Sequence, residues 1–131
     1  MTKYARVAVR AAIELSENNC SAAESWSRAA EEVFTKGSAG YKKGCPRNAF
    51  LGLCEAGLIV GMSLREKPPE RDNGRYAIIA ARLLREEPAL AANPKAEIWR
   101  RVMVEAGADP NKQHNAQLDV VLGLRDAGLL R

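Results

Sequence analysis

Residues 51–58, Leu-Gly-Leu-Cys-Glu-Ala-Gly-Leu, return 71 positions later, at 122–129, as Leu-Gly-Leu-Arg-Asp-Ala-Gly-Leu. Two more blocks repeat in the same order at nearly the same spacing. One is 23–28 with 96–101, which share Ala-Glu and a Trp, and the other contains the pairs Tyr4-Ala5 and Tyr76-Ala77. Self-similarity at a fixed period indicates a repeated structural unit. We therefore predict that the chain is a tandem duplication.

Each unit is expected to contain three helices. In the first unit, apolar residues at helical spacing run from Tyr4 to Leu15 and again from Trp26 to Phe34. The second of these helices opens with the capping-box pattern Ser21-Ala-Ala-Glu24. A third helix is predicted from Pro46, a residue favoured at a first helical position, to Gly57, which is typical of a helix end.

The second unit shows the same order, with helices predicted around Tyr76 and Trp99 and a last one from Asp109-Pro110 to Gly128. That last helix would be about two turns longer than its counterpart. The N-cap would be Asp109 in this copy and Cys45 in the other. We expect the two tryptophans, Trp26 and Trp99, to occupy equivalent places in the core.

These patterns predict an all-α fold of six main helices, built as two pseudo-symmetric three-helix units in one compact domain, 1–131. The units would span 1–60 and 76–131, joined by a linker at 61–75. Pro-Pro and Asn-Gly pairs in this region are breaker and turn signals. They favour a charged linker or a short β-hairpin at 58–76.

The composition excludes several classes. The chain has 131 residues, 47% hydrophobic and 27% charged, which suits one globular domain. No apolar run is long enough to span a membrane. Three cysteines and one histidine without a Cys-x-x-Cys pair argue against a disulfide framework and a zinc site. We expect a cytoplasmic protein with no metal and no cofactor.

The net charge of +4 is unevenly spread, and the stretch from Thr35 to Cys54 contains basic residues but no acid. Glycines and a tyrosine accompany these residues in a loop that leads to a helix start. Such a patch can face phosphate or an acidic protein surface. The candidate binding residues are Lys36, Tyr41, Lys42, Lys43, Arg47 and Asn48.

Cys45 is the candidate reactive thiol, because a helix N-terminus and the flanking Lys43 and Arg47 favour a thiolate. A nucleophilic cysteine also needs a base, and the only histidine is His114. Pseudo-twofold packing of the units need not bring these two residues together. A structural or capping cysteine is the simpler interpretation, and we assign no catalytic residue.

The segment from Lys43 to Ile59, with its Gly-Cys-Pro start and its Leu-Gly-Leu-Cys-Glu-Ala-Gly-Leu end, resembles a motif in a family of small uncharacterised bacterial proteins. The similarity extends over most of the chain, from Tyr4 to Leu130. That family is a domain of unknown function. The resemblance implies a bacterial or phage-borne origin and transfers no activity.

The sequence favours a non-catalytic module that binds a macromolecule through the basic loop and helix start, in a regulatory or defence-related role. A protein partner is favoured over DNA, because +4 is low for a dedicated DNA binder. The alternative is a winged-helix-like DNA-binding regulator, in which Asn73-Gly74 would turn the wing. A third hypothesis is a Cys-dependent enzyme or redox sensor.

Overall fold

The structure is a computed structural model, which describes residues 1–62 and 69–131. It confirms an all-α fold with six main helices. In chain order the elements are α1 (Lys3–Glu17), α2 (Ala22–Val33), the single-turn α3 (Ala39–Lys42), α4 (Gly44–Glu55), α5 (Asp72–Glu86), the 3₁₀ turn η1 (Pro88–Ala92), α6 (Lys95–Ala106) and α7 (Gln117–Asp126).

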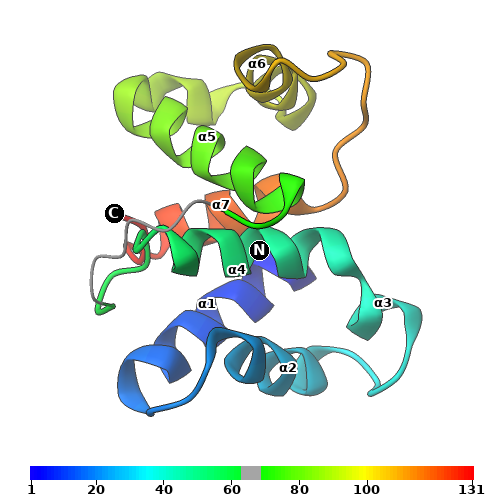
Figure 1. The fold of residues 1–131 in the computed structure, drawn as a ribbon, viewed down its shortest axis with the longest axis vertical. Coiled ribbons are helices and arrows are strands. Elements are labelled where there is room, and N and C mark those ends of the chain that lie inside the picture. The colour runs from blue at the N-terminus through cyan, green and yellow to red at the C-terminus, as the bar shows by residue number, and fades with distance from the viewer. Residues whose placement is uncertain (63–68) are drawn as a thin grey trace.

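The helices lie in three levels. The third helix of each predicted unit, α4 or α7, lies in the middle level, with α1 and α2 below and α5 and α6 above (Figure 1). The packing crosses between the units, because α4 packs along α5 and α7 packs along α1. Each third helix thus covers the first helix of the other unit.

Glycine makes both crossings possible. A Cβ on Gly52 would lie 2.2 Å from the Cα of Gly74, so α4 and α5 touch backbone to backbone. A Cβ on Gly123 would lie 2.6 Å from the Cβ and 3.0 Å from the Cα of Ala5, on α1. The glycine of each Leu-Gly-Leu repeat therefore plays the same structural role. Its lack of a side chain lets the first helix of the other unit pack closely against the third helix.

The ends of the two repeats pair with each other. Ile59 and Leu130, which are 71 residues apart, form an isolated antiparallel bridge. The Val60 amide donates to the Leu129 carbonyl at 2.9 Å, and the Arg131 amide donates to the Leu58 carbonyl at 2.7 Å. These reciprocal bonds support the predicted two-unit arrangement, although a pseudo-twofold axis stays a prediction.

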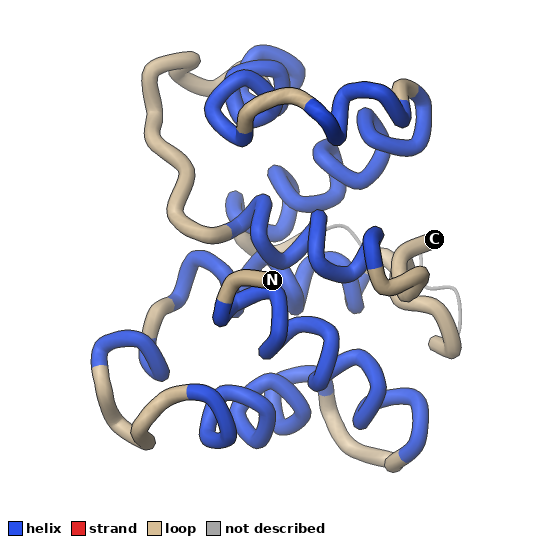
Figure 2. The backbone as a smooth tube through the Cα atoms, turned by 180° about the vertical axis from the view of Figure 1, so that it is seen from behind, coloured by secondary structure: helices blue, strands red, loops and turns tan. Residues whose placement is uncertain are grey.

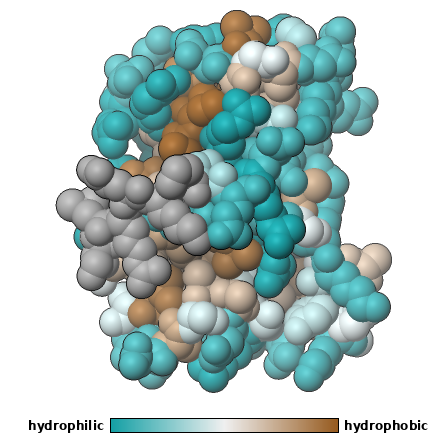
Figure 3. All heavy atoms as spheres, viewed as in Figure 1, coloured by the Kyte–Doolittle hydropathy of each residue, from teal (hydrophilic) through white to brown (hydrophobic). Residues whose placement is uncertain are grey.

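The core lies between the levels and contains both tryptophans, as predicted. Trp26 is 2% exposed and packs against Phe50 at 5.3 Å between ring centroids. Trp99 is 3% exposed and meets Tyr76 edge to face at 5.5 Å. Hydrophilic residues cover most of the surface in Figure 3, and hydrophobic ones gather in the left half of that face.

The serine half of the predicted capping box is present at the start of α2, where the Ser21 hydroxyl accepts a hydrogen bond from the Glu24 amide at 3.1 Å. Replacing Ser21 with alanine is expected to lower the free energy of unfolding by about 1 kcal/mol, because that amide loses its partner. Urea denaturation measures the loss. Ser27→Ala, in the interior of the same helix, is the matched control and should cost nothing; equal losses in the two variants would contradict the assignment.

Three sequence-based boundaries are wrong: the Asn73-Gly74 turn, the start of the last helix and the N-cap of α4. Asn73 and Gly74 lie in the first turn of α5, so they do not turn a hairpin or a wing. Within the hairpin predicted at 58–76, residues 63–68 lie outside the described ranges. The last helix begins at Gln117 rather than at Asp109. The Asp109 carboxylate accepts from the Asn111 amide at 2.9 Å, as an N-cap side chain would, but the chain makes only a turn there.

The N-cap of α4 is Lys43, not Cys45, and its side chain makes no capping hydrogen bond. Cys45 lies one residue inside the helix, where its own amide is part of the first turn. Along the described helices, none is long and apolar enough to cross a membrane.

Candidate functional site

The basic loop between α2 and α4 lies at one edge of the molecule, on the right in Figure 1 around α3. Ser38 caps α3 by accepting from the Tyr41 amide at 3.3 Å. The Tyr4 hydroxyl, on α1, donates to the Gly40 carbonyl at 3.0 Å. Burial raises the pKa of the Tyr4 phenol above its ordinary value, so the hydroxyl keeps the proton that it donates. The loop is thus fixed to α1.

The cations of the loop differ in their surroundings. Lys36 forms an ion pair with Glu31 at 3.5 Å, between side chains that are 76% and 42% exposed. Lys43 lies with its ammonium 5.3 Å from the centre of the Tyr4 ring, a cation–π arrangement. Lys42 is exposed and Arg47 is half-buried. In the described parts of the chain, no carboxylate lies within ion-pair distance of Lys42, Lys43 or Arg47.

The two uncharged candidates have different environments. Tyr41 is half-buried and packs against the hydrophobic core, so it supports the loop as well as bordering its surface. Asn48 is half-buried one turn into α4, and its amide nitrogen lies 3.8 Å from where a Gly44 Cβ would stand. The start of α4 therefore presents Arg47 and Asn48 beside the cations of the loop.

Cys45 is half-buried and lies against the loop that joins α6 to α7, where the side-chain amide Nδ2 of Asn115 donates to its sulfur at 3.7 Å. The α6–α7 loop therefore reaches the start of α4 through Asn115, a neighbour of His114 in the sequence. His114 itself packs against Trp99 at 6.3 Å, and within residues 1–62 and 69–131 it makes no hydrogen bond to Cys45. Nor do the described residues hold a cluster of three metal-ligating side chains.

A second group of basic residues lies in the other unit and was not predicted from the sequence. The ammonium of Lys112 lies 5.1 Å from the centre of the Tyr76 ring, and the Arg75 guanidinium lies 5.4 Å from the same ring. The same kind of contact joins Lys43 to Tyr4 in the first unit. The repeat of Tyr4-Ala5 as Tyr76-Ala77 was the sequence feature that could have predicted this second cation–π contact. In Figure 2 the α2–α4 and α6–α7 loops lie on the same side of the molecule.

The fold and the site define a class of protein, which is small and all-α with six main helices. Two loops with basic residues, α2–α4 and α6–α7, lie on the same side of it. The chain belongs to the Family of unknown function (DUF6979), whose model matches residues 1–131. Searches of curated proteins and of solved structures found no significant match.

Proposed function

We propose that the protein is a non-catalytic binding module of bacterial or phage origin, which engages an acidic surface of a protein partner in a regulatory or defence-related role. The contact would be made by the basic surface, defined as Lys36, Tyr41, Lys42, Lys43, Arg47 and Asn48.

The observation that carries the proposal is the set of three cations, Lys42, Lys43 and Arg47, that have no carboxylate partner among the described residues. The other exposed cations include several that are neutralised within the fold, such as Arg101 with Glu87 at 3.0 Å. These cations, which lie on the loop fixed to α1 and at the start of α4, leave a local positive field. Such a field steers an acidic partner to the surface and selects against basic ones.

The alternatives have less support. The DNA-binding alternative loses its wing turn, because Asn73-Gly74 is helical. The Cys-dependent alternative gains no base, because His114 packs against Trp99 and makes no hydrogen bond to Cys45 in the described chain. The duplex titration described below tests the DNA-binding alternative. The rate at which Cys45 is alkylated tests the Cys-dependent alternative.

The double variant Lys42→Glu with Arg47→Glu is expected to reduce capture of the protein partner from a lysate of the native host at least tenfold. It replaces two cations that have no carboxylate partner in the described chain, and it leaves Lys43 at the N-cap position of α4 unchanged. Capture by the wild-type protein should weaken steeply with salt, since the attraction is screened over about 10 Å at 0.1 M ionic strength. Quantitative mass spectrometry of the captured proteins provides the measurement.

The matched control is Arg6→Glu with Arg85→Glu, which makes the same charge change at exposed positions of α1 and α5. Equal loss in the two variants, or no salt-sensitive partner, would contradict the proposal. A duplex oligonucleotide titrated at low salt separates the DNA alternative. Tight, salt-sensitive duplex binding that the first variant abolishes would replace the protein partner with DNA.

A further inference from the structure

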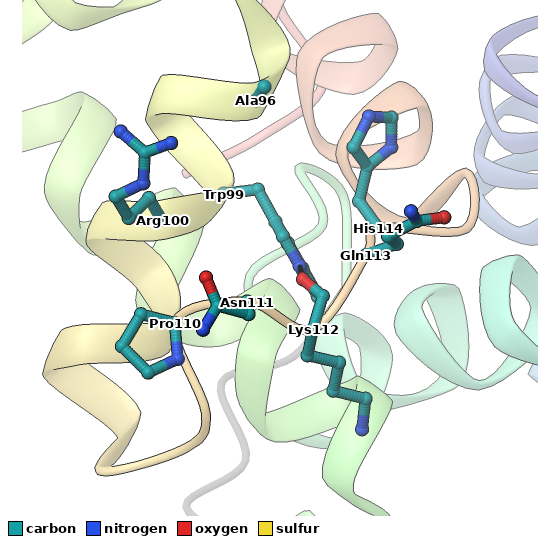
Figure 4. A pocket seen from close by; sticks show the side chains of 8 residues that line it. All are labelled: Ala96, Trp99, Arg100, Pro110, Asn111, Lys112, Gln113 and His114. Atoms are coloured by element: carbon teal, nitrogen blue, oxygen red, sulfur yellow. Dashed lines mark hydrogen bonds between the residues drawn. The ribbon is translucent and has the colours of Figure 1, made fainter.

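We propose a second, separate site, a hollow between α6 and the α6–α7 loop that binds the phosphate group of a small molecule. The hollow has a volume of about 370 Å³, within the range of small-molecule sites. It is lined by Ala96, Trp99, Arg100, Pro110, Asn111, Lys112, Gln113 and His114, which Figure 4 shows. This site does not depend on the function proposed above.

The side chains that line the hollow favour an anionic ligand, because they include cations and no carboxylate. The residues around the hollow include an arginine, a lysine, a histidine and two side-chain amides, but no acid. In the described chain neither Arg100 nor Lys112 has a carboxylate within ion-pair distance. An arginine can donate two parallel hydrogen bonds to a phosphate, and a lysine adds a compact positive charge. In Figure 4, Arg100 and His114 lie on opposite sides of Trp99, with Lys112 below.

The loop wall is held in place without a ligand. The Trp99 indole N–H donates to the Lys112 carbonyl at 2.7 Å, which ties the loop to α6. The Asp109 carboxylate, which precedes the loop wall in the sequence, accepts from the Asn111 amide at 2.9 Å and so bonds to the backbone. Lys112 is also held over the Tyr76 ring. A wall that is already ordered loses little conformational freedom when a ligand binds.

An unpaired polar atom supplies an independent indication. The Nδ1 atom of His114 is buried and has no hydrogen-bond partner within the described residues. Buried polar atoms are almost always paired, so an unpaired one asks for an explanation such as a missing ligand. The His114 side chain is also one of the residues that line the hollow, so a ligand seated there would lie beside the imidazole.

The test uses the two indole N–H signals in ¹H–¹⁵N spectra of the folded protein, assigned with Trp26→Phe. Inorganic phosphate and glycerol phosphate are titrated at constant ionic strength, with sodium chloride and acetate as the comparison salts. The Trp99 signal is expected to shift saturably at millimolar phosphate, and the Trp26 signal should stay in place. Arg100→Gln with Lys112→Gln, both at exposed positions, should weaken phosphate binding at least tenfold.

Arg6→Gln with Arg85→Gln is the charge-matched control and should bind phosphate like the wild type. The basic-surface variant Lys42→Glu with Arg47→Glu should also bind phosphate normally, which separates this site from the proposed partner surface. The proposal is overturned if phosphate gives no saturable shift, if acetate or chloride gives the same shift, or if the Arg100 and Lys112 variant binds as tightly as the wild type.

Discussion

Replacing Gly52 with alanine is expected to lower the free energy of unfolding by about 2 kcal/mol, as overpacking of a tight contact does. The added Cβ would lie 2.2 Å from the Cα and 2.9 Å from the carbonyl carbon of Gly74, so no side-chain rotation relieves the clash. The helices α4 and α5 must separate, and the buried residues on both sides lose contacts. The loss remains although alanine favours a helix over glycine by about 1 kcal/mol.

Gly44→Ala is the matched control, since it makes the same change in the same helix. There the new Cβ meets only the Asn48 side chain, at 3.8 Å, which is ordinary contact. This variant should be neutral or slightly more stable in urea denaturation. Gly123→Ala should behave like Gly52→Ala, because its Cβ would lie 3.0 Å from the Cα of Ala5. Wild-type stability of both Gly52→Ala and Gly123→Ala would show that the helix crossings are looser than described.

The same glycines show why the helices could be predicted from the sequence but the contacts between them could not. Repeat detection needs only the sequence, and the Leu-Gly-Leu pattern predicted two equivalent third helices. What the glycine does there depends on a partner from the other unit, Gly74 in one case and Ala5 in the other. Gly74 itself was interpreted as part of an Asn-Gly turn. The Asn-Gly pair favours a turn by local propensity, but here the tertiary contact decides the conformation. Gly74 in the first turn of α5 lets that helix approach the backbone of α4 at Gly52.

The start of α7 was mispredicted for a similar reason. Asp109-Pro110 is a typical helix start by local rules. In the structure the Lys112 carbonyl, which a helix would use internally, accepts from Trp99 instead. The side chain of Gln117 then accepts from the Asn115 amide and donates to Asn73 at 2.9 Å, which joins α7 to α5. These tertiary hydrogen bonds keep 109–116 in loop conformation.

The basic surface could be proposed from the sequence because its cations are neighbours there. The hollow could not, because Arg100 belongs to α6 whereas Lys112 and His114 belong to the next loop, and only the fold brings them together. Their local sequence also includes Asp109, which masks the charge pattern. These residues meet only because Trp99 packs against the loop and the loop follows its path along α6. Counting charges along the sequence does not reveal either feature.

Leu53→Ala and Leu124→Ala are each expected to lower the free energy of unfolding by about 2–5 kcal/mol, the usual cost of emptying a buried leucine site. Both side chains are 0% exposed, and they occupy the same position of the two Leu-Gly-Leu repeats. Val104→Ala is the control, because Val104 is 61% exposed and should change stability by less than about 0.5 kcal/mol.

The form of the unfolding transition matters as much as its midpoint. Because α4 packs on α5 and α7 packs on α1, neither unit keeps a complete core when the other unfolds. Each leucine variant should therefore shift one common transition, seen alike by tryptophan fluorescence and by circular dichroism, with an unchanged denaturant slope. A biphasic curve in which Leu53→Ala moves one step and Leu124→Ala the other would instead mean that 1–60 and 76–131 fold independently. Coincident shifts would make the duplicated chain one cooperative domain, in which either repeat is stable only with the first helix of the other against it.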